Sequence, residues 1–145
     1  MTPQKTPALA AIVLSRLAGI GVFLVIAGAL SLLATEGAPP ALQAVSAFFT
    51  RNIGLVLLFS VLFLLGEVFR ALPFPASLPG PFAAAAGSVL LVMFLVRLLL
   101  LTGTFSGISV FEGLPDFARL LYPAVFLLVL LAGLADCVRQ AYGHD

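Results

Sequence analysis

Four long apolar stretches, separated by short segments rich in proline, dominate this sequence. They cover about residues 8–34, 52–70, 82–102 and 119–141. A helix needs roughly 20 mostly apolar residues to cross the hydrocarbon core of a bilayer, and each stretch meets or approaches that length. Proline has no amide hydrogen and ends helices, so the proline-rich segments mark real breaks. The pattern predicts an all-α integral membrane protein with four transmembrane helices in a bundle, and residues 1–145 as a single transmembrane domain.

The composition agrees with a membrane protein and narrows the classes of function. Hydrophobic residues make up 62% of the chain, charged residues 9%, and the mean hydropathy is +1.23, whereas soluble domains carry about 25% charged residues. The seven basic and six acidic residues are scattered singly, so no basic stripe is available to bind nucleic acid. The expected partners are other integral-membrane subunits or copies of the same chain, together with membrane lipids.

Cofactor chemistry within this chain is limited by its residues. Cys137 is the only cysteine and His144 the only histidine, which excludes an internal disulfide and a haem held by two histidines of this chain. No nucleophile stands with a base in the sequence, no glycine-rich loop follows a strand, and no set of metal ligands is evident. We therefore expect no metal, no cofactor and no catalytic residue, and we do not expect an enzyme.

The first apolar stretch has some features of a cleaved leader peptide. Lys5 precedes it, and the small residues at 27–29 resemble a cleavage site. Arg16 interrupts the run, however, and the apolar part beyond it is long for a leader. The sequence therefore favours a retained transmembrane helix.

The distribution of lysine and arginine indicates an orientation, because cytoplasmic loops carry an excess of both. With the N-terminus inside, the inner ends carry Lys5, Arg16, Arg70 and Arg139, and the outer ends carry Arg51, Arg97 and Arg119. This small excess favours cytoplasmic N- and C-termini, and the bacterial inner membrane is the expected location.

The second and fourth stretches share an order of residues. FTR at 49–51 matches FAR at 117–119, and LGEVFR at 65–70 matches LADCVR at 134–139. Because both stretches cross in the same direction, a duplicated helical hairpin would be related by an axis along the membrane normal. The alternative is coincidence, since spans commonly end in charged residues and an acid three residues before an arginine is a common local pair.

Five charged residues near the inner ends are candidates for an ion-pair network or a relay. At about 1.5 Å per residue, Arg16, Glu67 and Asp136 each lie about 8 to 9 Å to the inner side of the midplane. One interpretation is a structural network, in which Glu67 pairs with Arg70 and Asp136 with Arg139. The other is a proton or cation relay through Glu67 and Asp136, as in a small oligomeric transporter or channel.

Arg97 lies within the third stretch, about 8 to 9 Å to the outer side of the midplane. An arginine costs roughly 3 kcal/mol at the centre of a spanning helix, which about a dozen apolar neighbours offset. One interpretation is that its side chain snorkels to the outer surface. The other is that it binds an acidic side chain, a lipid phosphate, an anionic ligand or a partner subunit. Glu36, Glu112 and Asp116 are the acids within its expected reach.

Two outer connections are more apolar than solvated loops. Residues 38–51 are predicted to start a short helix at their prolines, and residues 103–117 are too short and glycine-rich to span. Both are expected to lie in the membrane interface or to dock onto another subunit. Pro123, within the fourth stretch, is expected either in the first turn of its helix or at a kink.

Three functions remain open. The first is a non-catalytic accessory or scaffold subunit of a larger integral-membrane complex, and the second is the small oligomeric transporter or channel. In size and four-helix topology the chain also resembles DoxX-like proteins, a resemblance carried by no sequence motif. That resemblance implies a membrane protein that assists redox or quinone chemistry.

Overall fold

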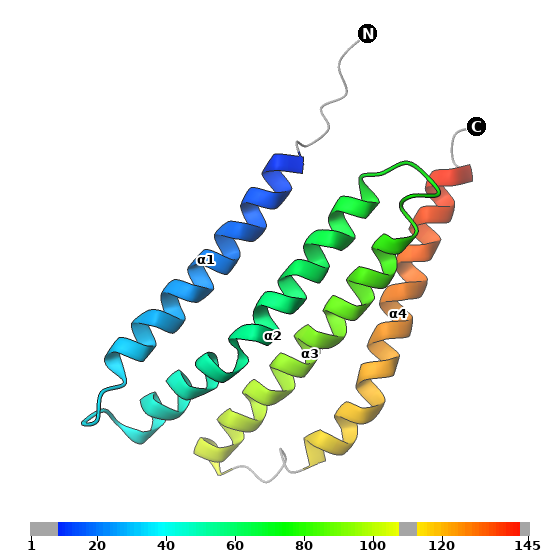
Figure 1. The fold of residues 1–145 in the computed structure, drawn as a ribbon. Coiled ribbons are helices and arrows are strands. Elements are labelled where there is room, and N and C mark those ends of the chain that lie inside the picture. Colours follow the sequence, from blue (N-terminus) through cyan, green and yellow to red (C-terminus); the bar gives the residue numbers. More distant parts are fainter. Residues whose placement is uncertain (1–8, 108–112, 143–145) are drawn as a thin grey trace.

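The computed structural model describes residues 9–107 and 113–142, and within these ranges the chain is built from four α-helices and no strand (Figure 1). The helices are α1 (Leu9–Leu33), α2 (Pro40–Arg70), α3 (Pro79–Ser106) and α4 (Leu114–Tyr142). All four are long and apolar enough to cross a membrane. The prediction of an all-α membrane protein with a bundle of four transmembrane helices is confirmed.

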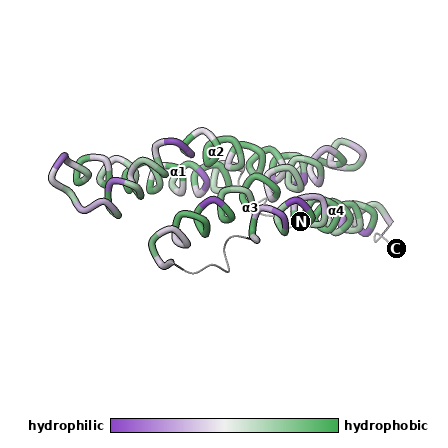
Figure 2. The backbone as a smooth tube through the Cα atoms, turned by 90° about the horizontal axis from the view of Figure 1, so that it is seen from below, coloured by the Kyte–Doolittle hydropathy of each residue, from purple (hydrophilic) through white to green (hydrophobic). Residues whose placement is uncertain are grey.

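The helices pack in chain order. α1 packs on α2, α2 on α3 and α3 on α4, so that α1 and α4 form the two sides of the molecule in Figure 1. The start of α1 and the end of α4 lie at the same end of the bundle in that view. Figure 2 shows mostly hydrophobic helices with a few hydrophilic positions among them. α2 and α3 each have a helix on both sides, whereas α4 packs principally against α3.

The second helix is longer than the sequence indicated. It begins at Pro40 rather than at residue 52, so a helix does start at these prolines as expected, but residues 40–51 are the first part of α2 and not a separate interfacial helix. Proline is well tolerated in the first turn of a helix, where its missing amide hydrogen has no intrahelical partner to lose. At 31 residues, α2 is about 46 Å long, which exceeds a hydrocarbon core about 30 Å thick.

The third and fourth helices also begin earlier than expected, at Pro79 and Leu114. In both cases the proline at the predicted break lies in the first turn of the helix. Pro123 is consequently inside α4, so of its two expected places the first turn of the helix is wrong, and the kink stays a prediction. α3 ends where Gly107 adopts a left-handed conformation, with φ of 63°, which glycine accepts readily.

Glycines allow close helix packing in the half of the bundle that contains the start of α1 and the end of α4, called here the inner half, with the opposite half called the outer half. A Cβ added to Gly66 of α2 would lie 3.2 Å from the carbonyl oxygen of Gly80 in α3. A Cβ added to Gly133 of α4 would lie 2.8 Å from the Cβ of Pro81 in α3, which real structures do not accommodate without a shift. Small residues drive helix association in lipid because they let backbones approach closely. The glycines therefore hold α2, α3 and α4 together.

Aromatic packing joins the helices in the outer half. Phe94 of α3 is only 9% exposed, and its ring lies within 5.5 to 6.5 Å, centroid to centroid, of four other phenylalanine rings. Those rings belong to Phe23 of α1 and to Phe48, Phe49 and Phe59 of α2. Offset and edge-to-face aromatic pairs add about 0.5–1.5 kcal/mol beyond their area burial. Phe23 thus attaches α1 to the central helices.

Candidate functional site

Two polar contacts between helices interrupt the apolar interior, and α2 takes part in both. Glu67 forms one near the inner end, and Asn52 forms the other toward the outer end. These residues are fifteen positions apart, or about 22 Å along the helix. The two contacts are called here the inner contact and the outer contact.

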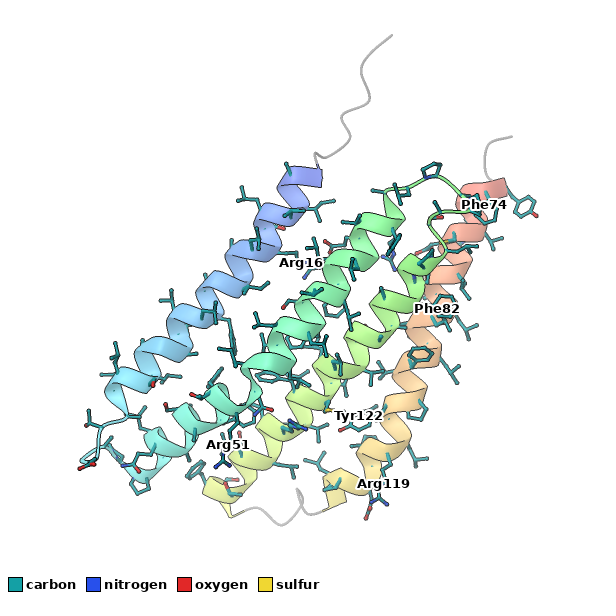
Figure 3. The ribbon with its side chains drawn as sticks, viewed as in Figure 1. Arg16, Arg51, Phe74, Phe82, Arg119 and Tyr122 are labelled. Atoms are coloured by element: carbon teal, nitrogen blue, oxygen red, sulfur yellow. The ribbon has the colours of Figure 1, made fainter. Side chains whose placement is uncertain are left out.

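The inner contact is an ion pair between α1 and α2. Arg16 donates from Nη2 to Oε1 of Glu67 and from Nε to Oε2 at 3.4 Å, so both carboxylate oxygens are used. The guanidinium also lies over the ring of Phe63, 5.6 Å from its centroid. Figure 3 shows Arg16 between α1 and α2. The side chains of Arg16 and Glu67 are 41% and 32% exposed, so the attraction between their charges is weaker than in a fully buried pair.

A cavity of about 250 Å³ borders the inner contact, and all four helices line it. Besides Arg16 and Glu67, its walls include Arg70 of α2, Ser88 of α3 and Val129 of α4. Glu67 pairs with Arg16 of another helix and not, as one interpretation expected, with Arg70. The cavity is therefore lined by two arginines and one carboxylate.

Asp136 and Arg139 do not join the inner contact. Both are exposed on α4, and the ion pairs among the described residues are Arg16 with Glu67 and Asp116 with Arg119. The expected local pair of Asp136 with Arg139 is therefore not formed. Asp136 lies three residues closer to the inner end than Gly133, which packs on Pro81 of α3.

Few polar side chains lie between the levels of the inner and outer contacts on α2 and α3. Ser60 and Ser88, the polar residues near the middles of α2 and α3, donate their hydroxyl hydrogens to carbonyl oxygens of their own helices. Residues 9–107 and 113–142 contain no group of three His, Cys, Asp or Glu side chains able to hold a metal ion. The single histidine lies outside these residues.

The outer contact joins Arg97 of α3 to Asn52 of α2. Arg97 donates from Nη1 to Oδ1 of Asn52 at 2.8 Å, and Asn52 donates from Nδ2 to the carbonyl oxygen of Phe48 at 2.8 Å. Asn52 is only 6% exposed, whereas Arg97 is exposed. A groove of about 500 Å³ begins here between α2 and α3, with Arg51 and Thr104 also in its walls. Figure 3 places Arg51 at this outer end.

The acids expected beside Arg97 lie elsewhere. Glu36 borders a neighbouring groove together with Arg51, and Asp116 is 3.9 Å from Arg119 in an exposed pair on α4. Glu112 falls outside the described residues.

The partner that Arg97 does have was missed in the sequence. Asn52 is the only asparagine in the chain, and a polar amide in an apolar span is a signal of a hydrogen bond between helices. Because neighbouring helices run antiparallel, depth counting from the two helix middles would have placed Asn52 within about one helical turn of Arg97.

Comparisons with protein-family models, curated proteins and solved structures find no match to this chain. The resemblance to DoxX-like proteins in size and topology stays a prediction.

Proposed function

We propose that this chain is a non-catalytic accessory or scaffold subunit of a larger integral-membrane complex, and that α4 docks on a helix of a different subunit. The observation that supports this is the exposed carboxylate of Asp136. Its exposed neighbours one turn away on α4 are Ala132 and Arg139. The exposed side of the helix also carries Leu128, Leu131 and Val138, each more than half exposed. A carboxylate among apolar side chains on a spanning helix is unfavourable unless it reaches water or a polar partner.

The partner helix is expected to carry a lysine or arginine near its inner end. Within this chain, α1 provides such a residue to Glu67 of α2 through Arg16. α4 has α3 as its principal neighbour, so the equivalent place beside Asp136 is free for another helix. A second copy of this chain would offer Arg70 or Arg139, both exposed near the inner end, so a homo-oligomer is the rival outcome that the test below separates. Charged residues within spanning helices generally pair with one another.

The location proposed for the chain is the bacterial inner membrane, with both termini in the cytoplasm. Four spans place the two termini on one side, and the excess of basic residues at that side supports the cytoplasmic assignment. Reporter fusions that are active only in the periplasm or only in the cytoplasm, attached after Tyr142, test the orientation. A periplasmic signal would contradict it.

The proposed function is tested by extracting the full chain from its own membranes in a mild detergent and measuring the mass of the intact assembly. A stoichiometric foreign membrane subunit is expected with the wild-type chain, and Asp136→Asn should lose it. Asp116→Asn is the matched control, because it removes an exposed carboxylate from the other end of the same helix. A homo-oligomer or monomer with the wild-type chain would overturn the proposal, as would equal retention in the two variants.

A further inference from the structure

The groove that begins at the outer contact is open, positively charged and partly apolar. It runs between α2 and α3 at the opposite end of the bundle from Asp136, so it is independent of the proposed docking of α4. We infer that this groove binds the phosphate group of a membrane phospholipid through Arg51 and Arg97. Three observations carry this inference: the way Arg97 is held, the charge in the groove, and the direction in which the groove runs.

Arg97 is held in place by a buried side chain. Its guanidinium has five N–H donors, and one nitrogen is fixed by the 2.8 Å bond to Asn52. Asn52 is itself fixed, because its amide nitrogen donates to the carbonyl oxygen of Phe48 in the preceding turn of α2. The guanidinium is thus positioned before a ligand arrives, and most of its donors remain for that ligand. A positioned arginine fork suits phosphate, which accepts two parallel hydrogen bonds from it.

The groove contains two positive charges and no carboxylate among its described lining residues. Arg51 and Arg97 both line it. Glu36 lies in the neighbouring groove, on the side of Arg51 that faces α1, and no ion pair joins the two residues. Two arginines on the surface of spanning helices are costly when unpaired. An anion that contacts both of them would offset that cost, and the anion that a bilayer supplies in quantity is the phosphate of its lipids.

The groove leads from Arg97 toward the outer surface and becomes polar at its far end. Thr104 lines it seven residues beyond Arg97 on α3, or about 10 Å closer to the outer surface. The apolar part of the wall comes from Phe48, Leu100 and Leu101. Positive charge beside an apolar wall fits a phosphate with an attached acyl chain better than it fits a free, fully hydrated anion. The groove volume of about 500 Å³ lies within the usual range of about 300–1,000 Å³ for small-molecule sites.

The inference is tested with the purified full chain in a nonionic detergent, by mass measurement of the intact protein with its bound molecules. Three probes separate the sources of binding: dioleoylphosphatidylglycerol, dioleoylglycerol with the same acyl chains and no phosphate, and inorganic phosphate. Phosphatidylglycerol is expected to bind to the wild-type chain. Dioleoylglycerol is expected to bind about tenfold more weakly, because it lacks the phosphate that the arginines contact.

Three variants locate the binding. Arg97→Gln and Arg51→Gln should each weaken phosphatidylglycerol binding about tenfold. Arg97→Lys should give an intermediate loss, because it keeps the charge and removes the planar fork. Arg119→Gln is the control, since Arg119 is an exposed arginine at the same side of the membrane but on α4. If Arg97→Gln fails to fold, Arg51→Gln still tests the site, because the described residues give Arg51 no hydrogen bond.

Several results would overturn the inference. Unchanged binding in both glutamine variants would place the lipid elsewhere on the molecule. Equal binding of dioleoylglycerol would show that only acyl chains are recognised. Displacement of the lipid by inorganic phosphate at equal concentration would assign the groove to a free anion.

Discussion

In α2 the carboxylate of Glu67 meets Arg16 of α1, whereas in α4 the carboxylate of Asp136, at the matching place in the shared sequence pattern, is exposed. The difference continues at the neighbouring positions. Gly66 is buried against α3, while Ala135, which matches it, is exposed. The shared order of residues therefore lies against neighbouring helices in α2, whereas in α4 it lies on the exposed surface.

The cause of this difference is the number of neighbours. α2 lies between α1 and α3, so two sides of it face protein, whereas α4 packs principally on α3. A local pattern of residues determines where a helix ends and where its charges lie along the axis, but it does not determine which helices stand beside it. If the two hairpins arose by duplication, one of them has kept a basic partner within the chain and the other has not.

The largest expected effect comes from the contact that attaches α4. Gly133→Leu should destabilise the chain by about 3 kcal/mol, because even a Cβ at this position would lie 2.8 Å from Pro81 and overpacking of this kind costs about 1–3 kcal/mol or more. Detergent-based unfolding measures the change. Ala132→Leu is the control, since Ala132 is exposed on the same helix. Equal stability of the two variants would show that α4 is not held by this contact.

Removal of one charge from the inner contact is expected to have a moderate effect. Glu67→Gln leaves Arg16 half-buried without its carboxylate, and the cost should be about 1–2 kcal/mol, between the values for exposed and buried pairs. The same unfolding measurement applies. Replacing both residues by leucine should recover much of the loss, because no unpaired charge then remains. A double variant less stable than Glu67→Gln would contradict this account of the inner contact.

A smaller effect is expected at the outer contact. Asn52→Leu removes the acceptor that holds Arg97 and should cost about 1 kcal/mol, the typical net value of a hydrogen bond. Thr102→Val serves as control, because Thr102 is exposed and its hydroxyl donates only to its own helix. An unchanged unfolding curve for Asn52→Leu would mean that the hydrogen bond to Arg97 contributes nothing to stability.

The smallest effect sharpens the comparison between the two acids. Asp136→Asn should change the stability of the purified chain by no more than about 0.5 kcal/mol, as for other exposed positions. The same kind of change at Glu67 should cost more, since only Glu67 has a partner within the chain. A loss in Asp136→Asn as large as that in Glu67→Gln would show that Asp136 is already satisfied within the chain.

The helices and their number could be predicted from the sequence because the signal is local. Spans of apolar residues and proline breaks locate four helices, and the structure has all four. The predicted helix starts are less accurate, because the spans are predicted to begin at residues 52 and 82, whereas α2 and α3 begin at Pro40 and Pro79. Proline ends a helix that precedes it and also begins one that follows it, so its sequence position alone leaves the boundary open.

The site was harder to predict, because it depends on which helices are neighbours. Depth counting placed Arg16, Glu67 and Asp136 at one level, and the structure brings only the first two together. Depth gives the position along the membrane normal, whereas pairing also needs the angle around each helix. The sequence favours acidic partners for Arg97 because of their opposite charge, whereas the structure gives it the neutral amide of Asn52 as a hydrogen-bond acceptor.

The most direct test of the central claim, that Asp136 faces a basic helix of another subunit, is a photo-crosslink formed in native membranes from a reactive residue placed at Ala132. Ala132 is exposed and lies one turn before Asp136 on the same face of α4. The expected product joins position 132 to a spanning segment of one foreign protein that carries lysine or arginine near its inner end, and Asp136→Asn should abolish it. A crosslink to a second copy of this chain, or to a segment without a basic residue, would contradict the claim.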